Sequence, residues 1–317
     1  MVCIAKDRIM KKVKDIGEIK LIEIFRKTYK CKKNTYLGIG DDAAIIKSPK
    51  KDELILFTCD TLVSDVHFIL KETTGFDVGW KAMGAGISDI AAMGGYPRNA
   101  IVSLALPSYI SMDYVNKLIK GMNKAASKFG VDIVGGDTVS SRKETVVTVS
   151  VIGTVLKNKL VLRGGAKNGD KILVTGTLGG SIFKKQFNFI PRVKESNWLV
   201  GNGRINAMMD ITDGLSLDLQ RLVTESKSGA LLYEKCIPIS KDAEKLKNPL
   251  AHVMNDGEDF ELLFTSSDSV SLLEKWPFKD VKLSVIGEIT KQKGRIEIKK
   301  GNGKIEAIIP KGYEHFK

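Results

Sequence analysis

Seven aspartates in this sequence share one local context, since each follows an apolar or β-like run and stands beside Gly, Thr or Ser. Taken singly, each has an ordinary interpretation as a turn or helix-capping residue. As a set they are harder to explain in that way, because a carboxylate among apolar neighbours is costly to bury unless it is paired or binds a cation. The seven are Asp41, Asp42, Asp60, Asp89, Asp137, Asp210 and Asp213. We therefore expect them to converge on metal.

The chemistry of this set favours Mg²⁺. Carboxylate oxygens with Thr and Ser hydroxyls nearby suit a hard cation better than a transition metal. The four cysteines are widely spaced and include no C-x-x-C pair, and the three histidines (His67, His252 and His315) stand in separate segments. Because neither kind of cluster that binds zinc is present, magnesium is the predicted ion.

Magnesium beside glycine turns indicates phosphate chemistry, because Mg²⁺ bridges phosphate oxygens and glycine N–H groups can approach them closely. The sequence "GGDT" at residues 135–138 is the strongest such motif, since its glycines directly precede a candidate ligand. Neither a P-loop nor a G-x-G-x-x-G fingerprint occurs in the sequence. The predicted site is therefore a phosphate site of another type.

Two residues keep alternative interpretations at this point. Arg163 could clamp a phosphate with its planar guanidinium, or it could be a surface cation at the domain junction. His67 follows Asp60 by seven residues and could contact a ligand, whereas a packed or surface histidine is the alternative. Spacing alone does not choose between these interpretations.

Strands and helices must position these residues, and both halves of the sequence mix the two. Apolar periodicity predicts helices over 16–27, 75–97, 112–130, 215–227 and 267–276, the second of them stopping at Gly94 and Gly95. Strands are predicted over 53–61, 99–107, 144–156, 230–234, 260–264 and 282–289, with strand and turn over 131–141. This mixture predicts an α/β (α+β) fold. The polar segment 163–170 follows the first half, and we expect an N-terminal domain over 1–157 and a C-terminal α/β domain over 158–317.

Composition narrows the class of protein. With 317 residues, 43% of them hydrophobic, the chain can bury the cores of two globular domains. It has no run of 18 apolar residues and no apolar signal-like run at its start, so we expect a soluble, cytoplasmic protein with reduced thiols and no membrane partner. The net charge of +13 comes from basic residues spread along the chain, which is typical of a solvated surface and argues against nucleic acid as a partner.

An ordered set of motifs resembles the thiamine-monophosphate kinase family over about residues 17–316. The motifs are "GIGDDAA", "TCDTLVSDVHF", "SDIAAMGGYP", "IVGGDT", "RGGAKNGDKILVTGTLG", "MDITDGL", "GEDFELLF" and "KGYEHF". Gly-Asp-Asp and the Ser-Asp and Ala-Met-Gly elements occur across the aminoimidazole-ribonucleotide synthetase-like superfamily. The "DTLV" and "HF" pair and the "GYEHF" end select the kinase.

The resemblance implies a fold and a reaction. The fold would consist of two α/β domains, with N-terminal domains pairing in a homodimer to complete a shared β-barrel and an active site in the cleft between domains. The reaction would be transfer of the γ-phosphoryl group of ATP to thiamine monophosphate, giving ADP and thiamine diphosphate, the last step in making thiamine diphosphate. Several Mg²⁺ ions would assist.

The resemblance also assigns residues. The expected Mg²⁺ ligands are Asp42, Thr58, Asp60, Asp89, Asp137, Asp210 and Asp213. The expected ATP contacts are Gly136, Asp137, Arg163 and Thr212, and the expected thiamine-phosphate contacts are His67, Glu258 and Tyr313. Cys59 stands where the family usually has Thr, which leaves only a backbone-mediated or weakened role there, and residues 184–199 are shorter than the family pattern, so their contribution stays open.

The mechanism expected from these residues is positioning and charge neutralisation. The acceptor is already an anionic phosphate, so we expect no residue to act as a general base. Two unit charges 4 Å apart repel by ~4 kcal/mol at an effective dielectric of 20, and Mg²⁺ offsets this repulsion. Two alternatives remain, which are another ATP-using synthetase of the superfamily with a different acceptor, and a non-enzymatic nucleotide- or RNA-binding protein favoured only by the positive charge.

Overall fold

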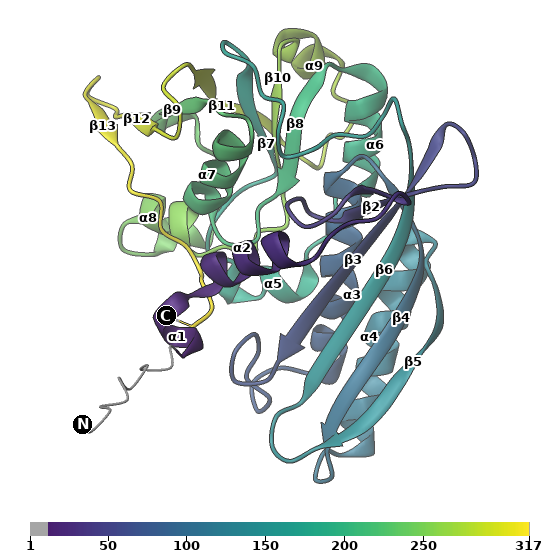
Figure 1. The fold of residues 1–317 in the computed structure, drawn as a ribbon. Coiled ribbons are helices and arrows are strands. Elements are labelled where there is room, and N and C mark those ends of the chain that lie inside the picture. Colours follow the sequence, from purple (N-terminus) through teal and green to yellow (C-terminus); the bar gives the residue numbers. More distant parts are fainter. Residues whose placement is uncertain (1–11, 317) are drawn as a thin grey trace, which may run out of the picture.

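The computed structural model describes residues 12–316 and places them in two halves, each built on a mixed β-sheet (Figure 1). In this described part the N-terminal sheet has the order β1-β2-β3-β6-β4-β5 and the C-terminal sheet the order β13-β12-β9-β11-β7-β10-β8. Helices flank both sheets, which confirms the predicted α/β (α+β) class. The strands are β1 (Thr35–Leu37), β2 (Ala44–Lys47), β3 (Glu53–Val63), β4 (Tyr96–Pro107), β5 (Asp132–Ser141), β6 (Val146–Leu156), β7 (Lys171–Thr175), β8 (Ile205–Asp210), β9 (Gly229–Tyr233), β10 (Leu262–Ser266), β11 (Leu283–Thr290), β12 (Ile296–Lys299) and β13 (Ile305–Ala307).

Two long helices, α3 (Gly75–Ala92) and α4 (Met112–Phe129), cover one face of the N-terminal sheet (Figure 1). Each begins at a side-chain cap, where Thr74 accepts from the backbone N–H of Asp77 and Ser111 accepts from that of Tyr114. Helix α4 ends at Gly130 in the left-handed conformation, as the terminal glycine predicts. The two predicted helices are therefore confirmed, with α3 ending a few residues earlier than its pattern.

Helices α3 and α4 are in close backbone contact because glycines line their interface. A Cβ atom added at Gly79 would lie 2.1 Å from the carbonyl oxygen of Leu118, and one added at Gly121 would lie 2.0 Å from that of Phe76. Such distances are far inside van der Waals contact, so only glycine permits this approach. The packing fixes the position of α3, which carries Asp89.

We expect Gly79→Ala to destabilise the protein by about 3 kcal/mol, because the added methyl group must push α4 away from α3. Gly201→Ala is the matched control, since no atom lies within 4 Å of a Cβ there and Gly201 stands in a helix, where alanine is favoured. Thermal unfolding of both variants measures the difference. Equal melting temperatures for Gly79→Ala and the wild type would contradict the close contact.

The C-terminal sheet has helices on both faces. Alternate residues of β7 point to opposite cores: Ile172 packs with Leu219 of α7 (Leu215–Glu225), whereas Leu173 packs with Leu199 of α6 (Val193–Asn202). Helix α8 (Pro249–Asn255) lies on the α7 side and α9 (Ser269–Lys275) on the α6 side. Because β7 is buried on both faces, its sequence "KILVT" has a continuous apolar run at its centre.

One predicted element needs correction. Residues 132–141 form a continuous strand, β5, so the "GGDT" sequence lies inside a strand and not in a turn. Glycines at 135 and 136 weaken the strand signal, and this is why the pattern suggested a turn. The proposed division at residues 157 and 158 falls between β6 and β7, the last strand of one sheet and the first strand of the other in chain order.

The two ends of the described chain lie side by side (Figure 1). Helices α1 (Val13–Ile16) and α2 (Glu18–Thr28) run beside the C-terminal segment, and the backbone N–H of His315 donates to Glu18 Oε2 at 2.9 Å. Within residues 12–316, no helix combines the length and apolar character needed to cross a membrane. The start of the sequence, where we expected no signal-like apolar run, lies mostly outside the described residues.

Candidate functional site

A cleft of about 1530 Å³ separates the two halves and holds most of the predicted site residues. Its N-terminal wall is formed by β3, α3 and the loop that precedes β2. Its C-terminal wall includes residues 181–184 and 186–188, residues 256–258 with Phe260, and the C-terminal segment. The volume is large enough for two substrates of metabolite size, given that pockets for one small ligand span about 300 to 1,000 Å³.

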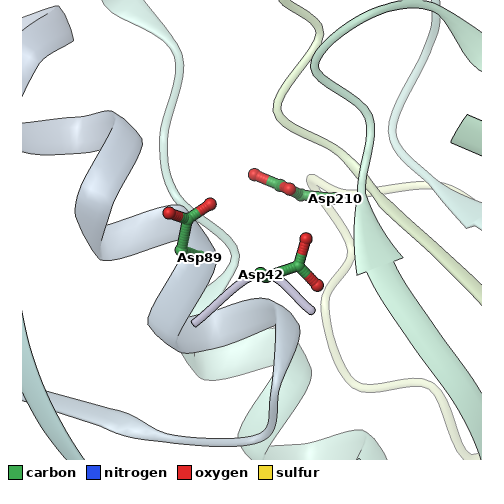
Figure 2. A group of neighbouring side chains, drawn as sticks. All are labelled: Asp42, Asp89 and Asp210. Carbon is green, nitrogen blue, oxygen red and sulfur yellow. The ribbon is translucent and has the colours of Figure 1, made fainter. Parts of the chain in front are cut away.

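Three aspartates from separate elements meet in this cleft. Asp42 lies in the loop before β2, Asp89 lies near the end of α3, and Asp210 ends β8. One carboxylate oxygen of each lies within 4.8 Å of the others, and Figure 2 shows the three groups around one shared space. Among the described residues, the buried Oδ2 of Asp42 has no hydrogen-bond partner. The arrangement suits a cation with oxygen ligands.

Hydroxyl groups donate hydrogen bonds to two of these carboxylates. Thr58 Oγ1 donates to Asp89 Oδ2 at 2.5 Å, and Ser88 Oγ donates to Asp210 Oδ2. Asp60 lies on β3, and in the described part of the chain its buried Oδ2 has no hydrogen-bond partner. Thr58 therefore lies where it was expected, but its hydroxyl hydrogen already serves Asp89.

The buried carboxylates of the cluster repel one another, so a positive charge among them would stabilise their ionised forms. Burial, together with repulsion from neighbouring aspartates, raises the pKa of Asp89 and of Asp210 well above the ordinary value. Burial and the charge of Asp42 raise the pKa of Asp60 to about 6, and burial and Asp42 raise that of Asp41 to about 7. A divalent cation placed among these groups would favour their ionised forms.

The raised pKa values predict how stability depends on pH. Because the folded pKa values of Asp41 and Asp60 exceed the unfolded value of 3.8, these groups stabilise the metal-free fold at pH 4 and lose that contribution as pH rises through 6 and 7. His67, whose pKa is lowered to about 4, acts in the opposite direction, but the raised carboxylates outnumber it. In EDTA, we expect Asp60→Asn to increase the melting temperature more at pH 8 than at pH 5. An equal increase at both values would contradict the titration.

Arg163 is paired with the cluster and does not lie on the open surface. Its Nε and Nη2 atoms donate to Asp42 Oδ1 at 3.1 and 2.5 Å, and its backbone N–H donates to Asp41 Oδ2 at 3.1 Å. Burial opposes the charge of Arg163, but the charge of Asp42 raises the pKa of the guanidinium above its ordinary value. Asp41 also accepts from the backbone N–H of Asp42, so Asp41 stabilises the turn.

The "ITDG" motif of residues 211–214 lines the same cleft, and its carboxylate is paired with an arginine. Asp213 Oδ2 pairs with Arg221 Nη1 at 2.5 Å, and the backbone N–H groups of Thr212 and Asp213 both donate to Asp218 Oδ2 at 3.0 Å. Sequence reasoning missed Asp218 and Arg221. The sequence feature that could have identified both residues is an aspartate on the buried face of an amphipathic helix, three residues before an arginine.

Asp137 and Gly136 lie apart from the three-aspartate cluster in the single chain. Register connects Asp137 with Ser103, Ser103 with Thr148 and Thr148 with Thr61, so Asp137 is three strands from β3, or about 14 Å. These two residues line a separate hollow of about 450 Å³ against α4. The expectation of one cluster of seven aspartates is therefore wrong for one chain, and the roles of Gly136 and Asp137 stay predictions.

The three expected substrate contacts gather at the far end of the cleft. His67 Nδ1 accepts from the backbone N–H of Val63, and burial, followed by the charge of Lys81, lowers the pKa of His67 to about 4. The His67 ring lies 6.4 Å from that of Tyr313 and 5.3 Å from that of His315. Glu258 forms an ion pair with Lys81, which sequence reasoning missed. A neutral histidine, an aromatic ring and a carboxylate thus share this end.

Comparison with known proteins identifies the class that this fold and site define. A model of the AIR synthase related protein N-terminal domain matches residues 40–155, and one of the corresponding C-terminal domain matches residues 190–299. The chain thus has the two-domain architecture of AIR synthase related proteins.

Closer relatives define the family. The chain is 35% identical to a thiamine-monophosphate kinase of Buchnera aphidicola subsp. Schizaphis graminum, over 95% of this chain and 99% of that protein. It is 34% identical to one of Rhodopirellula baltica, over 88% and 91%. A solved structure described as AaThiL complexed with AMPPCP and TMP superposes with a TM-score of 0.83 at 28% identity, covering 97% of this chain and 99% of that one. This chain belongs to the thiamine-monophosphate kinase family.

Proposed function

We propose that the protein transfers the γ-phosphoryl group of ATP to thiamine monophosphate, giving thiamine diphosphate and ADP. The observation that carries the proposal is the buried cluster of Asp42, Asp89 and Asp210 in a cleft of two-substrate size, in a chain of this family. The AaThiL relative is described as complexed with AMPPCP, a non-hydrolysable analogue of ATP, and with TMP. Both support a kinase that uses a phosphate group as acceptor.

We propose Mg²⁺ as the ion at the cluster, held by Asp42, Asp89 and Asp210. The donor set is all oxygen, and the buried Oδ2 of Asp42, which has no hydrogen-bond partner among the described residues, fits a ligand position. When bound, Mg²⁺ would neutralise charge on the phosphate groups of the two substrates. The charge of Asp60 acts on Asp89, and we propose Asp60 as a further ligand, whereas Asp213 would first have to leave Arg221.

The protein's own residues then position two anions. Arg163, already aimed at Asp42, supplies a planar cation for an ATP phosphate, and the Thr212 backbone lies on the same cleft wall. His67 is uncharged at neutral pH and orients the acceptor, and the anionic acceptor needs no general base. Gly136 and Asp137 remain proposed ATP contacts, on an exposed strand.

One assay tests this function. Purified protein, ATP, Mg²⁺ and thiamine monophosphate should yield equimolar ADP and thiamine diphosphate, which are separated by chromatography and identified by ³¹P NMR. Omitting thiamine monophosphate should leave ATP intact. ADP release without thiamine diphosphate, or a phosphorylated product from a different acceptor only, would show that the acceptor is wrong.

We also propose the homodimer with a shared β-barrel. Within residues 12–316, no helix covers the face of the N-terminal sheet opposite α3 and α4 (Figure 1). Phe57, Ile101, Val139 and Ile152 of this sheet are 38 to 49% exposed. Contiguous apolar exposure of this kind is typical of an interface. Sedimentation equilibrium should give twice the mass of one chain. The cytoplasmic location stays a prediction.

A further inference from the structure

Lys81 is a buried ammonium group in the wall of the cleft, outside the carboxylate cluster. Its side chain is 1% exposed, although lysine is rarely buried without partners. Its Nζ forms an ion pair with Glu258 Oε1 and donates to the carbonyl oxygen of His67 at 3.0 Å and to Gln186 Oε1 at 2.9 Å. These acceptors use the three N–H groups of the ammonium, so its position is determined from three sides.

Lys81 and Asp89 stand on the same side of α3. Lys81, Ala85 and Asp89 are spaced by four residues, and all three line the cleft. Eight residues of helix correspond to about 12 Å, so α3 carries the carboxylate cluster at one end and the Lys81 contacts at the other. A substrate with a phosphate at one end and an organic group at the other would span this distance.

Glu258, the ionic partner of Lys81, has an unusual backbone. Its φ is +55°, a left-handed value that costs free energy for a residue other than glycine. Its backbone N–H donates to the carbonyl oxygen of Thr212 at 2.7 Å. About a third of the side chain stays exposed in the cleft. The surrounding contacts therefore hold the Glu258 carboxylate at the cleft surface, although its backbone conformation is unfavourable for a residue other than glycine.

The remaining contacts come from residues 184–199, whose contribution the sequence left open. Helix α5 (Lys185–Asn188) packs on α3 and brings Gln186 to Lys81, with the ring centroid of Phe187 5.1 Å from Nζ. Both residues line the cleft. One ammonium group thus joins α3, the His67 segment, α5 and the Glu258 loop.

We propose that Lys81 is a positioning residue, which holds the Glu258 carboxylate toward the organic part of thiamine monophosphate. That part carries a positively charged thiazolium ring and an aminopyrimidine with N–H donors, and a fixed carboxylate is the side chain that matches both. Lys81 contacts Glu258 from α3, and because its side chain is only 1% exposed it acts through Glu258 and does not itself touch the substrate. This inference rests on the proposed function and adds to it the residue that sets affinity for the acceptor.

The test compares two lysines of the purified full chain that each pair with carboxylates. Lys81→Met is expected to raise the KM for thiamine monophosphate roughly ten- to hundred-fold, the loss expected from a hydrogen bond to a charged group. The KM for ATP should change by less than about three-fold. Lys185→Met is the control, because Lys185 pairs with the buried Asp259 and Glu261, of which neither lines the cleft. It should lower the melting temperature without changing either KM.

A double-mutant cycle separates positioning from a merely structural role. If Lys81 acts through Glu258, Lys81→Met should add little to the KM of Glu258→Gln, and isothermal titration of thiamine monophosphate should show the same coupling. Lys81→Gln, which keeps an N–H donor, should recover part of the affinity if Lys81→Met folds poorly. Additive effects, or equal rises in both KM values, would overturn the inference. Wild-type protein that makes no thiamine diphosphate would instead overturn the proposed function, and this inference with it.

Discussion

Asp89→Asn is expected to lower kcat by about a thousand-fold, which corresponds to about 4 kcal/mol of lost transition-state stabilisation. Asp89 shares one space with Asp42 and Asp210 and accepts from Thr58, so the amide replaces a charged oxygen at the centre of the cluster. The same change should raise the melting temperature of metal-free protein, because it removes one of several buried like charges. Steady-state kinetics and thermal unfolding in EDTA measure the two effects.

A fall in kcat together with a rise in the melting temperature of metal-free Asp89→Asn distinguishes a metal site from a cluster that supports the fold. Added Mg²⁺ should stabilise the wild type and have a smaller effect on Asp89→Asn, since only a bound ligand shifts the melting temperature in this way. Asp113→Asn is the control, because Asp113 is an exposed partner of Lys117 on α4. Loss of stability together with loss of activity in Asp89→Asn would mean that the carboxylate supports the fold and not the ion.

Arg163→Met is expected to lower kcat/KM for ATP by about a hundred-fold. The substitution keeps the apolar part of the side chain but removes the guanidinium that donates twice to Asp42 Oδ1. In the proposed complex this group faces an ATP phosphate, so its loss weakens ATP binding and leaves Asp42 without its charged partner. Initial rates over a range of ATP concentrations give the value.

Two further variants make this result specific. Arg163→Lys keeps the charge without the planar fork and should recover only part of the loss. Arg295→Met removes an exposed arginine that pairs with Glu297 on β12, and it should leave the kinetics unchanged. If Arg163→Met changes only the KM for thiamine monophosphate, Arg163 faces the acceptor and the ATP assignment is wrong.

The sequence predicted those elements whose signals are local. Helix α4 combines an apolar stripe with a terminal glycine, and both features follow from the backbone geometry of one segment. Asp42, Asp89 and Asp210 were singled out because a carboxylate among apolar residues is unusual wherever the fold places it, and the structure brings the three together. Their role as metal ligands stays a prediction. The ordinary interpretation of such aspartates as turn or helix-capping residues does not hold for Asp60, which lies within β3, or for Asp89, which lies within α3.

Other features depended on tertiary contacts that no local pattern records. Asp137 resembles the other aspartates in sequence, but strand order places it three strands from β3. Lys81 looks like an ordinary helical lysine, and only the approach of α5 and the Glu258 loop shows that it is buried. Arg163 had two interpretations until the structure placed it against Asp42.

A crystal structure with Mn²⁺, a non-hydrolysable ATP analogue and thiamine monophosphate would test the central claim most directly. Mn²⁺ replaces Mg²⁺ at oxygen sites and scatters anomalously, so its position can be located independently of the protein density. We predict an anomalous peak within about 2.2 Å of carboxylate oxygens of Asp42, Asp89 and Asp210, with phosphate oxygens completing the coordination. Metal bound only elsewhere in the cleft, with these three carboxylates unliganded, would contradict the account.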